Sequence, residues 1–172
     1  VAVGWYALRE SVSGGSNTAL GHYTLTRTTT GASNTAVGNA TLQYNTTGSY
    51  NTGVGHRALD QATTADSNTA VGYQALYLNT TGASNSALGV GALDANTTGN
   101  YNVALGYGSL GANTASNNVA IGYDALTANT TGGNNIAVGY QALNANTTAS
   151  NSVAIGCQAL YTCTTGAENI AI

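Results

Sequence analysis

The sequence predicts an all-β chain folded as a parallel β-solenoid (a β-roll) of about ten coils, each about 17 residues long. Glycine recurs at intervals of 17 residues, with a single interval of 16 between Gly106 and Gly122. A leucine follows each of these glycines four residues later, without exception. A unit of this length is too short for the helix pairs of α-helical repeats. We therefore expect residues 1–172 to form a single repetitive segment of short strands and turns, with equivalent residues stacked roughly 4.7–4.9 Å apart.

Two columns of identical residues define the repeat. The leucines are expected to form the structural core, and the glycines to mark close packing between coils or between chains. The leucine column comprises Leu8, Leu25, Leu42, Leu59, Leu76, Leu93, Leu110, Leu126, Leu143 and Leu160. The glycine column comprises Gly4, Gly21, Gly38, Gly55, Gly72, Gly89, Gly106, Gly122, Gly139 and Gly156.

The segment before each glycine alternates like a strand. In Thr69-Ala-Val-Gly72, for example, Val71 must face away from Ala70 and Gly72. Because burial of large aliphatic side chains drives folding, we expect the aliphatic residue before each glycine to join the leucines inside. The alanine and glycine side would then be flat, approached by a backbone across a thin coil or by a second chain. Glycine could also be needed for a positive φ at a corner.

The remaining parts of each unit have the chemistry of turns and ladders. Asn-Thr-Thr-Gly, as at Asn79–Gly82, supplies residues that favour tight turns. An asparagine opens nearly every unit, and stacked asparagine side chains can bond to one another from coil to coil. This asparagine column comprises Asn17, Asn34, Asn51, Asn68, Asn85, Asn102, Asn118, Asn135 and Asn169, with Ser152 as its one substitute.

Composition argues against several functions. Only 5% of residues are charged, against about 25% in ordinary domains, and three arginines without lysine make nucleic-acid binding implausible. No apolar run is long enough for membrane insertion. The six carboxylates are scattered, and His22 and His56 lie two coils apart, too far for one metal ion. We expect no enzyme, no metal and no cofactor.

Exposed rings are the strongest indication of a contact surface. Trp5, Tyr73, Tyr107, Tyr123 and Tyr140 share the column that follows the glycine. They could stack to line one corner of the coil. They could equally form a ladder of exposed rings that contacts a ligand such as a sugar, since tyrosine combines a large apolar area with a polar tip.

The sequence leaves two covalent features undecided, a disulfide and N-glycosylation. Cys157 and Cys163 belong to one coil and could form a disulfide in an oxidising compartment, or could be free small residues. Asn45, Asn79, Asn96, Asn129 and Asn146 each begin Asn-Thr-Thr, which is an acceptor pattern for N-glycosylation. The same pattern is also ordinary turn chemistry.

The repeats Asn118-Val-Ala-Ile-Gly122, Asn135-Ile-Ala-Val-Gly139 and Ser152-Val-Ala-Ile-Gly156 resemble the head repeats of trimeric autotransporter adhesins. The longer unit also resembles repeats of phage tail fibres and large bacterial surface proteins. This resemblance covers all ten repeats, although the repeats of that family are usually shorter. It implies a left-handed parallel β-roll, three chains side by side, and adhesion outside the cell.

We therefore expect an extracellular, cell-surface or virion fibre segment that attaches to a host-cell glycan or protein. The chain begins and ends inside a repeat, which suggests a segment of a longer fibre. Two alternatives remain. A column of threonines suggests an ice-binding solenoid, although adjacent threonines point to opposite faces. The ends of the chain suggest a subunit of a self-assembling extracellular filament.

Overall fold

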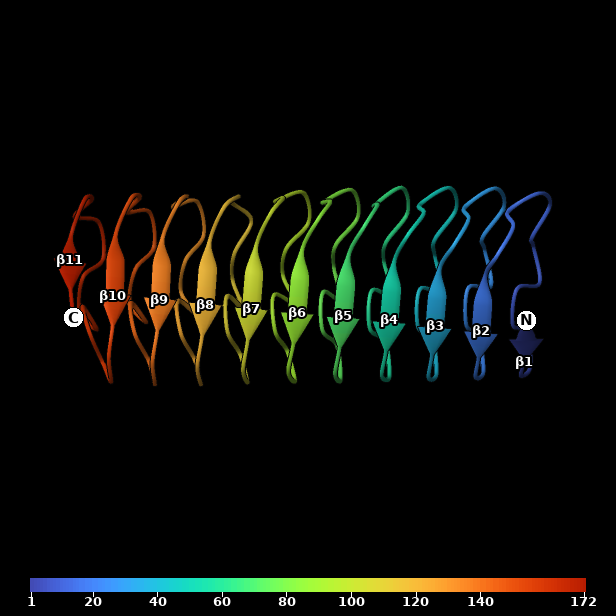
Figure 1. Cartoon of the computed structure of the whole chain (residues 1–172), viewed down its shortest axis with the longest axis horizontal. Coiled ribbons are helices and arrows are strands. Elements are labelled where there is room, and N and C mark those ends of the chain that lie inside the picture. The colour runs from blue at the N-terminus through green and yellow to red at the C-terminus, as the bar shows by residue number, and fades with distance from the viewer.

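The computed structural model describes all residues from Val1 to Ile172, and it consists of eleven short parallel strands stacked in chain order in one sheet. The strands lie side by side along a rod whose termini are at opposite ends (Figure 1). They are β1 (Ala2–Val3), β2 (Thr18–Leu20), β3 (Thr35–Val37), β4 (Thr52–Val54), β5 (Thr69–Val71), β6 (Ser86–Leu88), β7 (Val103–Leu105), β8 (Val119–Ile121), β9 (Ile136–Val138), β10 (Val153–Ile155) and β11 (Ile170–Ala171). The predicted parallel β-solenoid of about ten 17-residue coils is confirmed.

The register between coils is set by the sequence repeat. Ala19 of β2 pairs with Ala36 of β3, 17 residues on, and the same spacing links most neighbouring strands. Between β7 and β8 the spacing is 16, yet Ala104 still pairs with Ala120. The missing residue is therefore absorbed in the turn at Asn113–Ser116, and the sheet continues unchanged.

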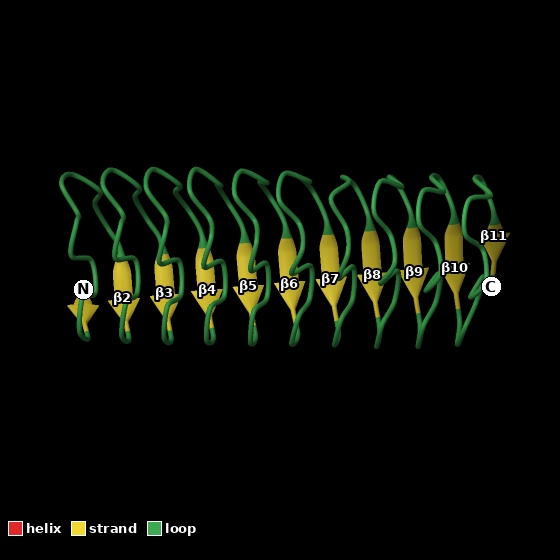
Figure 2. Ribbon diagram, turned by 180° about the vertical axis from the view of Figure 1, so that it is seen from behind, coloured by secondary structure: helices red, strands yellow, loops and turns green.

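Backbone pairing continues around the whole coil. Of 109 backbone hydrogen bonds, only 19 lie within the strands. The N–H of Leu25 donates to the carbonyl of Thr41 at 3.1 Å, and that of Thr29 to Thr46 at 2.9 Å, each in the next coil. The loops accordingly run parallel to one another along the rod (Figure 2). Each coil is held by its neighbours on every side, which satisfies backbone groups that three-residue strands alone would leave unpaired.

The glycine column forms the corner that follows each strand. Every member has a φ between 130° and 142°, a region that other residues rarely adopt. A Cβ at Gly72 would also overlap the carbonyl oxygen of Gly89 in the next coil. The close approach predicted for this column is therefore found between successive coils of one chain, at a corner that also requires a positive φ.

The leucine column fills the centre of the coil. Eight of the ten leucines are fully buried, while Leu8 and Leu160 in the end coils are partly exposed. All ten have a left-handed backbone, with φ between 47° and 56°. That conformation costs roughly 1–2 kcal/mol per residue, and burial of a leucine side chain returns about 1.5–3 kcal/mol. Burial of the leucine side chain thus offsets the cost of the left-handed turn at these positions.

The strand faces the other way from the prediction. The alanines are inside: Ala36, Ala70 and Ala120 are fully buried in the core cluster. The aliphatic residues that precede the glycines are outside, with Leu20 48% exposed and Leu88 49% exposed. The expectation that these aliphatic residues line the interior, and that a second chain meets the alanine side, is therefore wrong. The coil is too thin to hold a second large side chain opposite each leucine.

The predicted asparagine ladder is confirmed, and it is buried. The Oδ1 atom of Asn17 accepts two hydrogen bonds from Asn34, one from the backbone N–H at 2.9 Å and one from Nδ2 at 3.2 Å. The Nδ2 of Asn34 also donates to the carbonyl of Gly48 at 2.9 Å. The pattern repeats through Asn102, and the bond from the backbone N–H continues to Ser152. This ladder satisfies amide groups that would otherwise be buried without partners.

A second column of buried asparagines begins each Asn-Thr-Thr turn, and it is interrupted. The Nδ2 of Asn96 donates to Oδ1 of Asn79 at 2.8 Å and to the carbonyl of Gly99 at 3.0 Å. The corresponding residue after Asn45 is Ala62, which has no amide group. The Oδ1 of Asn45 is consequently buried without a hydrogen-bond partner.

We expect Gly72→Ala to destabilise the fold by more than about 2 kcal/mol, because the new methyl group overlaps Gly89 and the corner requires a positive φ. Gly15→Ala is the matched control, because nothing lies within 4 Å of its Cβ position. Thermal unfolding followed by circular dichroism measures both. Equal unfolding temperatures for the two variants would contradict the role given to this corner.

Ala62→Asn should stabilise the chain by about 1 kcal/mol, because its amide would donate to the unpaired Oδ1 of Asn45 and accept from Asn79. Ala62→Asp is the matched control, since a carboxylate of the same shape offers no donor and buries a charge. Chemical denaturation measures both free energies of unfolding. A lower stability for the asparagine variant would show that this position cannot extend the column.

Candidate functional site

The outward side of the sheet is one apolar face. It is built from the aliphatic residues before the glycines and from the first residue of each strand, which becomes aliphatic from β7 onward. Val103 is 39% exposed, Leu105 39% and Ile136 40%. A shallow groove of about 220 Å³ runs between β5, β6 and β7, and Val71, Leu88, Val103 and Leu105 contribute its aliphatic lining. Large contiguous apolar patches on protein surfaces are often interaction sites, so this face is a candidate contact surface. We call it the strand face.

The aromatic column lies outside the coil, on the corner that follows the strand. Trp5, Tyr73, Tyr107, Tyr123 and Tyr140 are between 47% and 67% exposed. Tyr107 and Tyr123 stack with ring centroids 5.2 Å apart, and Tyr123 and Tyr140 with centroids 5.5 Å apart. Three of the five rings therefore stack on one another and remain accessible at the same time, whereas Tyr73 stacks on His56.

Val90 interrupts this column. It lies between Tyr73 and Tyr107, where the ring ladder is broken. Beside it, Gly91 and Gly108 stand in the column where other coils carry Arg57, Gln74 or Gln141. The result is a hollow of about 390 Å³, bounded by Tyr73 and Gln74 at one end and by Asp124 and Thr127 at the other. We call it the central hollow.

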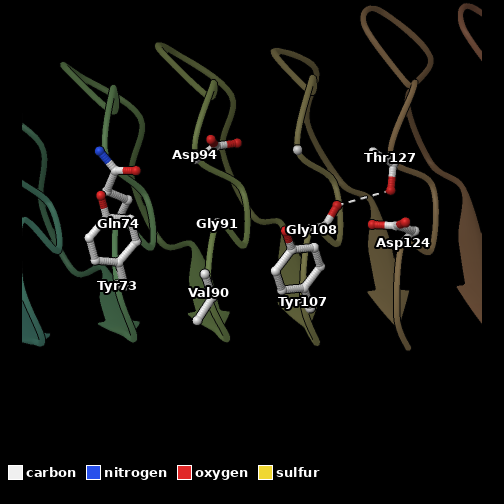
Figure 3. A pocket seen from close by; sticks show the side chains of 10 residues that line it. Tyr73, Gln74, Val90, Gly91, Asp94, Tyr107, Gly108, Asp124 and Thr127 are labelled. Carbon is white, nitrogen blue, oxygen red and sulfur yellow. Dashed lines mark hydrogen bonds between the residues drawn. The ribbon is translucent and has the colours of Figure 1, made fainter.

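Four successive coils contribute to the central hollow, and Figure 3 shows how its side chains lie. Val90 and Tyr107 lie along one side, and Asp94 stands beyond Gly91 on the other. The wall at Thr127 is fixed, because its hydroxyl donates to the carbonyl of Gly108 at 3.0 Å. The cavity thus combines aromatic surface with two carboxylates, and Asp94 and Asp124 make no ion pair.

Burial raises the pKa of two carboxyl groups on this corner, those of Asp94 and Asp60. It raises the pKa of the Asp94 carboxyl, and the backbone N–H groups of Asp94 and Ala95 offset the rise only in part. Burial also raises the pKa of the Asp60 carboxyl, although the Arg57 guanidinium acts in the opposite direction. Both carboxylates are therefore poorly solvated, and the charged form of Asp94 has no cation to stabilise it.

All three arginines of the chain stack on tyrosine rings. The guanidinium carbons of Arg9, Arg27 and Arg57 lie 4.5–4.6 Å from the ring centroids of Tyr6, Tyr44 and Tyr77. Arg57 also donates from Nε to Asp60 at 2.9 Å and from a terminal nitrogen to the Tyr77 hydroxyl at 2.6 Å. This Arg57 cluster is a complete guanidinium site built from the chain's own residues.

Of the two alternatives that the sequence leaves open for Cys157 and Cys163, the structure has the free thiols and no disulfide. Cys157 occupies a place in the exposed aromatic column. Cys163 takes the place of a turn asparagine, and its sulfur contacts the carbonyl of Gly166 at 3.4 Å. One side chain therefore points out of the coil while the other packs toward its interior.

The glycosylation interpretation is wrong for the folded chain. Asn45, Asn79, Asn96, Asn129 and Asn146 are fully buried. Their amide nitrogens donate inside the coil, as Asn129 does to the carbonyl of Gly132 at 2.8 Å. An attached glycan would have no room there, so these residues act as turn and ladder residues.

The threonine column that suggested ice binding has a structural role. The hydroxyl of Thr46 donates to the carbonyl of Thr63 at 2.9 Å, and that of Thr80 donates to Thr97 at 3.0 Å. Seven hydroxyls of this column join one coil to the next in this way, namely those of Thr29, Thr46, Thr63, Thr80, Thr114, Thr130 and Thr147. No residue of this column lines the central hollow or the groove on the strand face.

Comparison with family models, with characterised proteins and with solved structures found no match. No group of three or more His, Cys, Asp or Glu side chains is placed to hold a metal ion. None of the chain's segments is a membrane-spanning helix. The strand face, the aromatic column and the central hollow are therefore the features from which a function can be argued.

Proposed function

We propose that the chain is a non-catalytic segment of an extracellular fibre, and that it displays a surface for attachment to a host or substrate. The observation that carries the proposal is the strand face, which exposes aliphatic side chains along the rod from Val3 to Ile155. A rod of ten coils stacked at 4.7–4.9 Å is roughly 48 Å long. An apolar strip of that length is unfavourable in water unless another surface covers it.

The cover that we propose is two further copies of the same chain, packed side by side into a trimer. A copy offers a strip of matching length and periodicity, so equivalent coils can meet without a change of register. The resemblance to trimeric adhesin heads and to tail fibres supports three chains. Packing on the strand face leaves the aromatic column outside, because the residues of the two surfaces follow opposite sides of the glycine corner.

The aromatic column is the attachment surface in this proposal. Tyr107, Tyr123 and Tyr140 form an accessible stack of three rings in successive coils. Such rings can pack on the apolar faces of sugars while their hydroxyls take part in hydrogen bonds. We propose a host-cell glycan or a protein on the host surface as the partner.

In sedimentation and light scattering the chain should have three times its monomer mass of 17.1 kDa. Leu88→Asp combined with Leu105→Asp should reduce it to a monomer, because two charges per chain would be buried in the interface. Thr81→Asp combined with Thr98→Asp is the control, since these threonines are exposed on a turn. A wild-type monomer at all concentrations would contradict the proposed trimer.

Tyr123→Ala combined with Tyr140→Ala should weaken attachment to immobilised host-cell glycans or surface proteins roughly tenfold, because two contact rings are lost. Tyr50→Ala combined with Tyr101→Ala is the control, since these tyrosines are 67% and 65% exposed in another column. Retention of the labelled protein on glycan and protein arrays gives the comparison. Equal losses for both pairs would remove the aromatic column from the attachment surface.

A further inference from the structure

We propose that the central hollow is a binding site for a guanidinium group, presented as an arginine side chain of a partner peptide or protein. The hollow shares Tyr73 and Tyr107 with the aromatic column but no residue with the groove on the strand face. The proposal therefore does not rest on the fibre function or on the trimer.

The chain contains its own template for such a site. In the Arg57 cluster, a guanidinium lies 2.9 Å from the carboxylate of Asp60, over the ring of Tyr77 and within hydrogen-bond distance of its hydroxyl. Asp60 is fully buried. The cluster shows that this corner of the coil can accommodate a planar cation between a buried carboxylate and an aromatic ring.

The central hollow lies at the equivalent place two coils further on, and it keeps the carboxylate of the cluster but neither its guanidinium nor its ring. The carboxylate is kept, because Asp94 stands where Asp60 does. The ring of Tyr77 has no counterpart, and the rings that line the hollow are instead Tyr73 and Tyr107 of the aromatic column. Glycines replace the two residues whose side chains fill the template. The equivalent residues are Gly91 for Arg57 and Gly111 for Tyr77. The space that remains is about 390 Å³, and a flat cationic group with part of its peptide can occupy it.

The backbone does not require glycine at this corner. Gly91 and Gly108 have φ values of 63° and 61°, close to the 59° of Arg57 and the 54° of Gln74 in the same column. Nothing lies within 4 Å of the position that a Cβ of Gly91 would take. The turn at Gly91 therefore accepts a larger residue, and the distinct consequence of glycine there is the open space. At Gly108 a Cβ would lie 2.5 Å from Oδ1 of Asp124, so that glycine lets the Asp124 carboxylate approach the hollow.

The charge of the hollow favours a cation. The chain has no lysine, and no arginine follows Arg57, so neither Asp94 nor Asp124 has a cationic partner within its own chain. Asp94 and Asp124 come from coils two apart, roughly 9.6 Å along the stack. A guanidinium near Asp94 would form charge-assisted hydrogen bonds, and the tyrosine rings offer it a cation–π contact. An ammonium group lacks the planar fork that the template uses.

The test is a titration of the whole chain with N-acetyl-arginine amide, followed by NMR of methyl-labelled Val90 on the wall of the hollow. The lysine and citrulline amides are the comparison ligands, since the first has a different cation and the second is nearly isosteric but neutral. We expect saturable shifts with arginine, weaker ones with lysine and none with citrulline. Asp94→Asn should lower the affinity for arginine roughly tenfold, because a charge-assisted bond is lost.

Two variants separate binding from folding. Gly91→Arg should abolish binding, because its own guanidinium would occupy the hollow as Arg57 does in the template, and the chain should remain folded. Asp66→Asn removes the same charge from an exposed turn and should bind arginine like the wild type. Absence of saturable binding to the wild type, equal binding of citrulline or lysine, or binding retained in folded Gly91→Arg would overturn the proposal.

Discussion

The rod depends on the hydrogen bond that each buried asparagine oxygen accepts from the asparagine of the next coil. The backbone N–H of Asn34 is buried and lies just before the strand, where only the Oδ1 of Asn17 can accept from it. A shift of register by one residue would leave every such N–H without a partner, at a cost of about 1–3 kcal/mol each. The column thereby selects the 17-residue repeat and brings the glycine corner, the leucine and the turn into line.

A thin interior follows from this arrangement. One leucine, two alanines and two asparagines nearly fill the space in a typical coil, and buried asparagines must be kept within reach of their partners. The second large aliphatic residue of each repeat is therefore displaced to the outside, on the strand face. The same constraint that keeps the coil narrow thus exposes an apolar strip, which is the surface on which we propose that the chains of a trimer pack.

Much of the fold could be predicted from the sequence, because the same residue types recur at the same place in successive coils. The repeat length, the leucine core and the asparagine ladder all follow from residues that occupy the same place in nearly every coil. Which side of the strand faces inward could not be predicted, because alternation states only that Ala70 and Val71 point in opposite directions. The usual preference for burying the larger side chain gave the wrong answer. The buried position of Asn79 likewise depends on where its turn folds, which the Asn-Thr-Thr pattern alone does not specify.

The central hollow could not be predicted from the repeat, because it is formed by residues that differ from those at the same place in other coils, such as Val90, Gly91 and Gly108. The glycine, leucine and asparagine columns hold the coils together, so a substitution there disturbs two neighbours at once. The columns of Arg57 and Asp60 lie on the outer corner, and they hold tyrosine, arginine, glutamine, glycine, aspartate, threonine and asparagine in different coils. Their backbone geometry stays the same whichever residue is present, as the φ values of Arg57 and Gly91 show. Chemistry can therefore vary along this corner without affecting the stack, and adjacent glycines in it create an opening whose shape neighbouring coils define. In this rod, residues of the outer corner can differ from coil to coil without changing how the coils align. We therefore expect a binding site to form at such positions, as proposed for the central hollow.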